Sequence, residues 1–204
     1  ATREQLMEVL WPDEDPGRLS NRLSVALSTV RAVLDPRHRF ASDRFVLADK
    51  HVVALADLPV DVEEFLAVAN AGLDRQRQPG PEALAELVAA ESAYTGDFLE
   101  EDPYDDWAVP LREEARATYL AVARTLAATA AAAGRHDQAV RYHLRVLERD
   151  PYDEDAHLGL VATLSGAGRH GEARRRYRLY AGRMAELGVE AAPFPDRAPS
   201  LTRP

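Results

Sequence analysis

The sequence predicts a mainly α-helical protein, a tetratricopeptide-like helical solenoid preceded by a small part that contains a β-hairpin. Three observations lead to this fold class. From residue 60 onward, apolar residues recur three and four positions apart, as they do on one face of a helix. After Leu126 the chain repeats itself with a period of 34 residues. Residues 44–47 and 52–55 are the only convincing strands, because both runs are rich in β-forming residues.

The first residues predict a short helix. Thr2 is the expected N-cap because Gln5 follows three positions later, which is the spacing of a capping box. Leu6, Val9 and Leu10 then share one face of the helix. The helical pattern opens almost at the first residue, which suggests that the chain is part of a longer protein.

A second helix is expected from Gly17 or Arg18 to Leu34. Its apolar residues follow at spacings of four, four, three and four, and they form one stripe: Leu19, Leu23, Leu27, Val30 and Leu34. The opposite arc carries Arg18, Asn21, Arg22, Val25, Ser28 and Thr29, with Arg31 at its border. We expect the β-hairpin of residues 44–55 to follow this helix.

The remainder of the chain has a helical period. Residues 62–69 predict one helix, and a second opens at Pro81. An acidic linker with aromatic residues covers 97–107, and Pro110 begins a long helix. Trp11 and Trp107 are interpreted as core anchors between elements.

A shift of 34 residues aligns two copies of a helix, a glycine-containing turn and a second helix. The aligned pairs include Gly134 with Gly168 and His136 with His170. Glycine permits the positive φ at which many helices end. The small residues expected between the paired helices are Ala133, Ala139 and Ala173. Each pair buries its apolar side by stacking on a neighbour, and such solenoids often bind a protein partner on their concave surface.

Charge is distributed unevenly along the chain, whose net charge is −9. Residues 16–50 contain seven basic and three acidic residues, whereas residues 51–110 contain two basic and fourteen acidic residues. Residues 111–204 contain fifteen basic and twelve acidic residues. Nucleic-acid binding is therefore compatible with the first fifty residues and implausible for the next sixty.

Composition narrows the protein class further. The chain has no cysteine, which excludes disulfides and cysteine-based zinc sites and favours a reducing cytoplasm. No apolar run approaches the roughly 20 residues of a membrane helix, and the N-terminus lacks the pattern of a signal peptide. We expect a cytoplasmic protein that makes no contact with the membrane.

Several separated motifs resemble one family. Those of the first part resemble the winged helix of SARP-type regulators: Arg3-Glu4-Gln5-Leu6, Leu10-Trp11-Pro12 and Asn21-Arg22-Leu23-Ser24-Val25-Ala26-Leu27-Ser28. Those of the second part resemble the bacterial transcriptional activator domain (BTAD): Asp61-Val62-Glu63-Glu64-Phe65, Tyr94-Thr95-Gly96-Asp97-Phe98-Leu99, Asp106-Trp107 and Leu187-Gly188-Val189-Glu190. Residues 96–107 also look like the version found in large ATPase-linked transcriptional regulators.

The resemblance implies a domain organisation. Residues 1–56 would form a partial OmpR-like winged helix-turn-helix, whose N-terminal strands and first helix are missing. Residues 57–192 would form the BTAD helical domain. Residues 193–204 contain four prolines and are expected to form a flexible tail.

The resemblance also implies DNA binding, with residues 18–34 as the recognition helix in the major groove. Asn21 could then pair with adenine and Arg22 with guanine or phosphate. The β-hairpin of residues 44–55 would be the wing, and basic residues on or near it would neutralise the charge of the DNA backbone. The candidate DNA-binding residues are Arg18, Asn21, Arg22, Ser28, Thr29, Arg31, Arg37, Arg39, Arg44 and Lys50. The alternative is an ordinary solvated helix face, since only three arginines lie on this helix.

Other motifs do not predict a catalytic or ligand site. Gly166, Gly168 and Gly171 match the dinucleotide-binding pattern, but they follow a helix and not a strand. The acidic residues Glu100, Glu101, Asp102, Asp105 and Asp106 do not match the calcium-loop spacing. They are expected to form a solvated loop, or to meet the basic segment 174–176 or a basic partner. We expect no enzyme activity, no cofactor and no metal.

Two functions remain open from the sequence. The first is a transcriptional regulator that binds double-stranded promoter DNA through the parent protein and couples to a protein partner, or self-associates, through the helical repeats. The alternative is an interaction or oligomerisation module of a larger signalling ATPase that does not bind DNA. A complete winged helix without DNA affinity would favour the alternative.

Overall fold

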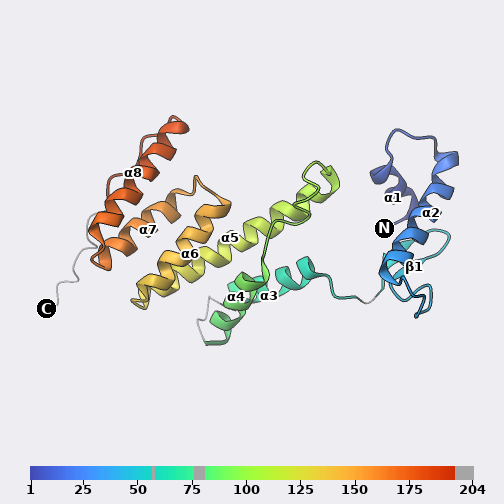
Figure 1. The fold of residues 1–204 in the computed structure, drawn as a ribbon, viewed down its shortest axis with the longest axis horizontal. Helices are drawn as coiled ribbons and strands as arrows, with labels where there is room; N and C mark the ends of the chain where they lie inside the picture. The colour runs from blue at the N-terminus through green and yellow to red at the C-terminus, as the bar shows by residue number, and fades with distance from the viewer. Residues whose placement is uncertain (57, 76–80, 196–204) are drawn as a thin grey trace. The chain divides into compact units, whose positions relative to one another are not determined.

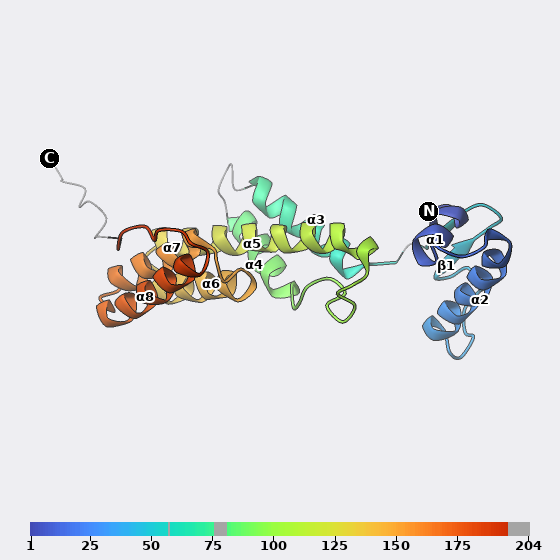
Figure 2. The same cartoon turned by 90° about the horizontal axis from the view of Figure 1, so that it is seen from above.

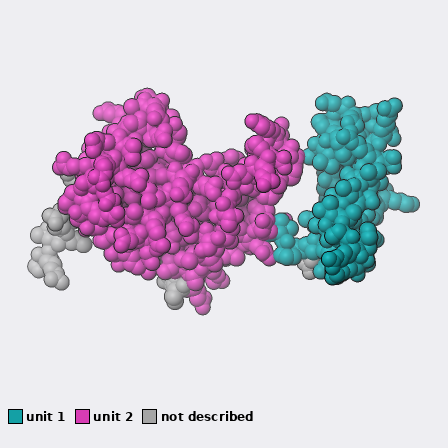
Figure 3. Space-filling model, in the orientation of Figure 1, with its two compact units in different colours: residues 1–60 teal, residues 61–204 magenta. Residues whose placement is uncertain are grey.

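The structure is a computed structural model that describes residues 1–56, 58–75 and 81–195. The chain divides into two compact units, Ala1–Val60 and Asp61–Pro204, which Figure 3 shows in different colours. Each unit is described by itself. The mainly helical fold with one hairpin that the sequence predicts is confirmed (Figure 1).

The first unit begins with α1 (Arg3–Leu10), which has the predicted capping box. The Thr2 hydroxyl accepts a hydrogen bond from the Gln5 backbone N–H at 3.1 Å, and the Gln5 side chain accepts one from the Thr2 N–H at 2.9 Å. Two of the four free N–H groups at the helix start are thereby satisfied. Of the expected apolar face, Val9 and Leu10 are exposed, and Met7 packs on the core beside Leu6 instead.

Helix α2 (Pro16–Leu34) packs its predicted stripe only in part. Leu23 and Leu27 join Val46 and Val53 in the core of this unit, with Trp11 packed against them. In contrast, Val30 and Leu34 are 44% and 46% exposed. The predicted stripe is therefore confirmed as a helical pattern, and its last two members are not buried.

The predicted hairpin is present and shorter than expected. Strand β1 (Val46–Ala48) pairs antiparallel with β2 (Val53–Leu55). The turn is closed by the Asp49 carboxylate, which accepts the backbone N–H groups of His51 and Val52, both at 2.7 Å. These hydrogen bonds lower the pKa of Asp49 because they favour its charged form.

The chain start lies against the hairpin. Thr2 forms a bridge to Val52, and Ala1 exchanges backbone hydrogen bonds with Val53 at 3.0 and 3.1 Å. This pairing places α1 beside the hairpin. Sequence periodicity contains no signal for it, because its partners are about fifty residues apart.

The second unit consists of helices that pack in antiparallel pairs along the chain. They are α3 (Asp61–Arg75), α4 (Pro81–Ala93), the short 3-10 helix η1 (Asp106–Ala108), α5 (Val109–Ala132), α6 (His136–Arg149), α7 (Glu154–Gly166) and α8 (His170–Glu186). Each long helix packs on the next one in sequence, and α3 and α4 both also pack on α5 (Figures 1 and 2). This is the arrangement of a helical solenoid.

The two repeats have equivalent turns, as the 34-residue period predicts. Gly134 and Gly168 have φ values of 68° and 75°. At each turn the glycine N–H and the following arginine N–H bond back to the last helical carbonyls, in the pattern of a Schellman motif. His136 and His170 begin α6 and α8 at matching positions.

Small residues allow the paired helices to approach at positions that the sequence predicts only partly. Ala139 and Ala173 are fully buried, but Ala133 is exposed at the end of α5. Gly159 on α7 was not anticipated. A Cβ atom there would overlap the His143 ring, so the glycine admits this ring between α6 and α7.

The solenoid ends in a segment that turns back onto α8. The Ala192 backbone donates to the Tyr180 hydroxyl at 2.7 Å and accepts from the Tyr177 hydroxyl at 2.8 Å. The Phe194 ring packs edge-on against Tyr177, with ring centroids 5.2 Å apart. Of the expected flexible tail, residues 196–204 lie outside the described residues.

Candidate nucleic-acid interface

The outer arc of α2 is exposed. Arg18, Asn21, Ser28 and Thr29 all have exposed side chains, because the opposite face of the helix carries the core leucines. The Thr29 hydroxyl is bonded to the Val25 carbonyl at 3.1 Å within the helix. Within the described part of the chain, the side chains of Arg18, Asn21 and Ser28 have no hydrogen-bond or ion-pair partner, and that of Thr29 has one local bond.

Arg22 lies on the same arc but has protein partners. It forms an ion pair with Glu14, and its guanidinium lies 4.5 Å from the centre of the Trp11 ring. Both contacts are on the surface, where an ion pair contributes about 0–1 kcal/mol. Phosphate oxygens can replace the Glu14 carboxylate at little cost.

Arg31 at the border of the arc is half-buried. One terminal nitrogen donates to the Val46 carbonyl at 2.9 Å, whereas the buried Nε has no partner among the described residues. Arg31 therefore ties α2 to β1. Its first role is to orient the hairpin relative to the helix.

The loop after α2 carries the next basic residues. Arg37, Arg39 and Arg44 are exposed on it. The Asp35 carboxylate shapes this loop, because it accepts a hydrogen bond from the Phe40 backbone N–H at 2.9 Å. Hydrogen bonds from the backbone N–H groups of Arg39 and Phe40 lower the pKa of Asp35. Lys50 is exposed in the hairpin turn.

A pocket of about 340 Å³ separates this loop from α2. Ser28 and Arg31 line it from the helix, and His38 and Phe40 line it from the loop. The pocket therefore joins two of the candidate residues, Ser28 and Arg31, to the loop that carries Arg37 and Arg39.

Sequence reasoning missed Arg3. Its guanidinium donates to the Ser24 hydroxyl at 3.1 Å, which places another positive charge beside the outer arc of α2. This contact arises only in the tertiary structure, because the pairing of Ala1 and Thr2 with Val53 and Val52 of the hairpin brings Arg3 beside α2. The residues lie 21 positions apart, and no local pattern joins them.

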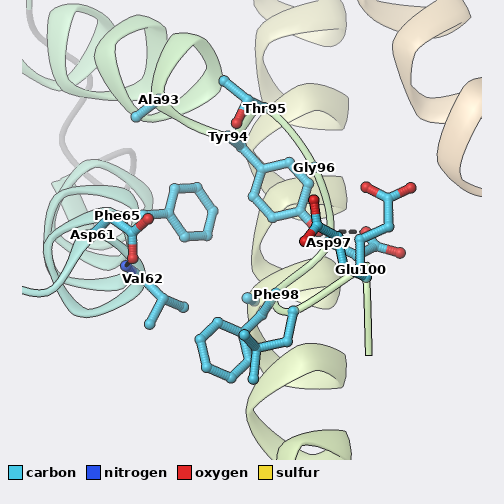
Figure 4. Close-up of a pocket in the computed structure, with 13 residues that line it drawn as sticks. Asp61, Val62, Phe65, Ala93, Tyr94, Thr95, Gly96, Asp97, Phe98 and Glu100 are labelled. Carbon is cyan, nitrogen blue, oxygen red and sulfur yellow. Dashed lines mark hydrogen bonds between the residues drawn. The ribbon is translucent and has the colours of Figure 1, made fainter. Parts of the chain in front are cut away.

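The second unit contains a pocket of about 600 Å³ between α3, the α4–α5 linker and α5 (Figure 4). Phe65 and Tyr94 lie on it, and Tyr94 stacks on Tyr119 with centroids 4.3 Å apart. The Tyr94 hydroxyl donates to Asp97 at 2.7 Å, and burial raises the pKa of Tyr94. Arg116 and Arg149 both lie about 4 Å from the Asp97 carboxylate. These contacts give the Tyr94–Leu99 motif a structural role, because they fix the start of the linker against α5 and α6.

The acidic linker is ordered by Arg112. Its guanidinium donates four hydrogen bonds of 2.8–3.1 Å to the backbone carbonyls of Phe98, Leu99, Asp102 and Pro103. The acidic side chains of residues 100–106 are exposed, and Trp107 is 50% exposed, so its interpretation as a core anchor was wrong. In the described ranges, no ion pair joins them to the arginines of 174–176, and no acidic or histidine cluster is arranged to hold a metal.

The comparisons with known proteins identify the family. The family model of the bacterial transcriptional activator domain matches residues 60–195. The chain belongs to the bacterial transcriptional activator domain family. The members of this family are transcriptional regulators, and the match covers the helical unit that the sequence assigns to the domain. No curated protein sequence matches the chain significantly.

A solved structure supports the fold of this BTAD protein. The chain is similar to Mycobacterium tuberculosis EmbR, determined in complex with a low-affinity phosphopeptide, with a TM-score of 0.70 at 20% identity. The likeness covers 95% of this chain and 52% of the EmbR chain, so the protein spans about half of that length. It confirms the tetratricopeptide-like solenoid preceded by a partial winged helix-turn-helix. Among the described residues, every helix is too short or too polar to cross a membrane.

Proposed function

We propose that this BTAD protein is the DNA-reading and signal-coupling part of a bacterial transcriptional regulator. Residues 1–56 act as the winged-helix part, and residues 57–192 couple it to a protein partner. The observation that carries the proposal is the division of α2, which buries Leu19, Leu23 and Leu27 and exposes an opposite arc that is polar except for Val25. Membership of a family of transcriptional activators supports it.

Each candidate residue then has a defined role in the complex with DNA. Asn21 pairs with adenine in the major groove, and Arg22 exchanges Glu14 for guanine or phosphate. Arg18, Ser28 and Thr29 contact phosphates from the same helix. The remaining basic residues neutralise the DNA backbone from the loop and hairpin, namely Arg37, Arg39, Arg44 and Lys50. Arg31 orients the hairpin through Val46 and adds its charge.

The test is sequence-specific binding by the parent protein. Double-stranded DNA selected from a promoter library is titrated by fluorescence anisotropy with wild-type protein, Asn21→Ala and Arg39→Ala. Asn21→Ala removes a base contact, so it should cost about 1–3 kcal/mol of binding free energy and relax specificity at one base position. Arg39→Ala removes a phosphate contact, so it should weaken binding to all DNA sequences about equally.

The same experiment separates the alternative function. An interaction module that does not bind DNA predicts no enrichment of any sequence by the wild-type protein. Wild-type specificity that survives Asn21→Ala unchanged would remove α2 from the base-reading role. In either case the fold of the variant is checked by circular dichroism, since Asn21 is exposed and its loss leaves the core intact.

A further inference from the structure

Two complementary surfaces occupy different parts of the second unit. One is the linker that precedes α5, and the other lies on α8. Figures 1 and 2 both show the linker at the start of α5, whereas α8 packs on α7 further along the stack. The two surfaces are therefore separated within one molecule.

The first surface is an acidic knob, formed by residues 99–106. Glu100, Glu101, Asp102, Asp105 and Asp106 are all exposed on it. Tyr104 is 93% exposed at its centre. Because Arg112 holds three carbonyls of the knob and that of Phe98 directly before it, the knob is ordered before it meets a partner, and little conformational entropy is lost on binding.

The second surface is a basic socket, a pocket of about 600 Å³ lined by Arg174, Tyr177, Arg178 and Phe194. The two arginines are exposed and lie one helical turn apart. Neither forms an ion pair with any residue in the described ranges, unlike Arg169 and Arg183 on the same segment. Tyr177 is fixed by its bond to Ala192, so the aromatic side of the socket is also ordered.

The chemistry of the two surfaces matches. The socket offers two guanidinium groups beside two aromatic rings, which suits an aromatic side chain flanked by carboxylates. The knob offers one fully exposed tyrosine among five carboxylates. Tyrosine and arginine are also the residues that dominate binding energy at protein interfaces.

We propose that the acidic knob of one copy of this protein docks into the basic socket of a second copy, head to tail. Tyr104 enters the pocket between Arg174 and Arg178, and the neighbouring carboxylates pair with the arginines. The contact joins two different surfaces, so each copy keeps a second free end. Association therefore continues into a chain or closes into a ring.

This inference goes beyond the proposed function and does not depend on it. The contact requires no DNA, and its surfaces share no residue with the candidate nucleic-acid interface. Failure of the docking would leave the DNA-binding proposal standing, and the reverse is also true.

The experiment uses the 204-residue chain in analytical ultracentrifugation at low salt, with two variants. The knob variant is Tyr104→Ala with Asp105→Asn, and the socket variant is Arg174→Glu with Arg178→Glu. All four side chains are exposed, so both variants are expected to keep their helical content. Wild-type protein should associate as its concentration rises, and each variant alone should associate at least about tenfold more weakly.

Mixing the two variants gives the decisive result. The mixture holds one intact knob and one intact socket, so it should form a heterodimer and nothing larger. Added salt should dissociate it, because the contact is mainly ionic and exposed. A control is Arg141→Glu, which reverses the charge of one exposed arginine on α6, outside the socket, and should associate like wild type.

Three results would overturn the proposal. The first is wild-type protein that remains monomeric at about 1 mM, where even a weak contact is populated. The second is a mixture that does not restore association, which indicates a symmetric interface or a different surface. The third is loss of association in Arg141→Glu equal to that of the socket variant, which indicates an effect of overall charge.

Discussion

At the scale of single residues, Gly168 in the turn before α8 and Gly182 within α8 should respond oppositely to replacement by alanine. Gly168 has a φ of 75°, and a Cβ atom there would meet no other atom within 4 Å, so only backbone strain opposes the change. Gly168→Ala should lower the free energy of unfolding by about 1 kcal/mol. Gly182 lies within α8 with equal space, and Gly182→Ala should raise it by about 0.5–1 kcal/mol. Urea denaturation measures both, and equal signs would contradict the positive φ at Gly168.

His143 should make stability depend on pH. Burial lowers the pKa of its ring, and the Asp153 carboxylate opposes this in smaller measure. The folded protein therefore holds a neutral ring, while the unfolded chain takes up a proton near its ordinary pKa of about 6.5. Stability should be complete above that pH and fall as the pH decreases below it. His143→Leu should flatten this slope between about pH 7.5 and 5.5, and an unchanged slope in urea denaturation would assign the pH dependence to other groups.

Several single-residue roles could be predicted from the sequence. In each case the signal lies in a short stretch of sequence around the residue. The capping pair of Thr2 and Gln5 lies within one turn, and Gly134 and Gly168 were located by the repeat itself. Arg3 and Arg112 could not be found in this way. Their partners are carbonyl and hydroxyl groups 9 to 21 residues away, brought near by tertiary packing.

At the scale of elements, the α4–α5 linker depends on one guanidinium. Arg112→Lys keeps the charge of the side chain but loses the planar fork that reaches four carbonyls. Amide hydrogen exchange should accelerate over residues 98–106, and the unfolding free energy should fall by about 1–3 kcal/mol. Arg141→Lys, a change at an exposed position on α6, serves as the control. Unchanged exchange in the linker would show that Arg112 is not what orders it.

Element positions could be predicted from the sequence better than element burial. Periodicity located α2, and Pro81 and the 34-residue repeat located the helices of the second unit. Val30 and Leu34 belong to the predicted stripe but are exposed, because a stripe shows which residues share a face, whereas a neighbour must also cover that face to bury it. Trp107 shows the same limit, since its size suggested burial and the linker holds it half in solvent.

At the scale of the whole molecule, the division into two units follows the division of charge. The basic surplus of residues 16–50 lies in the first unit, and the acidic surplus of residues 51–110 lies mostly in the second. The family match begins at residue 60, where the first unit ends. The distribution of charge along the sequence was thus enough to predict which unit carries the candidate interface. The individual candidate DNA contacts were chosen from the outer arc of α2 and the basic residues that follow it.

The most direct test of DNA reading by α2 and the hairpin is the salt dependence of DNA affinity. The parent protein is compared with its Arg22→Ala/Arg44→Ala variant on one selected duplex, and Arg141→Ala in the helical unit controls for lost charge. The double variant should bind at least about tenfold more weakly, and its slope of log affinity against log salt should shrink by about 1–2. Equal affinity and equal slope for the double variant and the wild type would contradict the account.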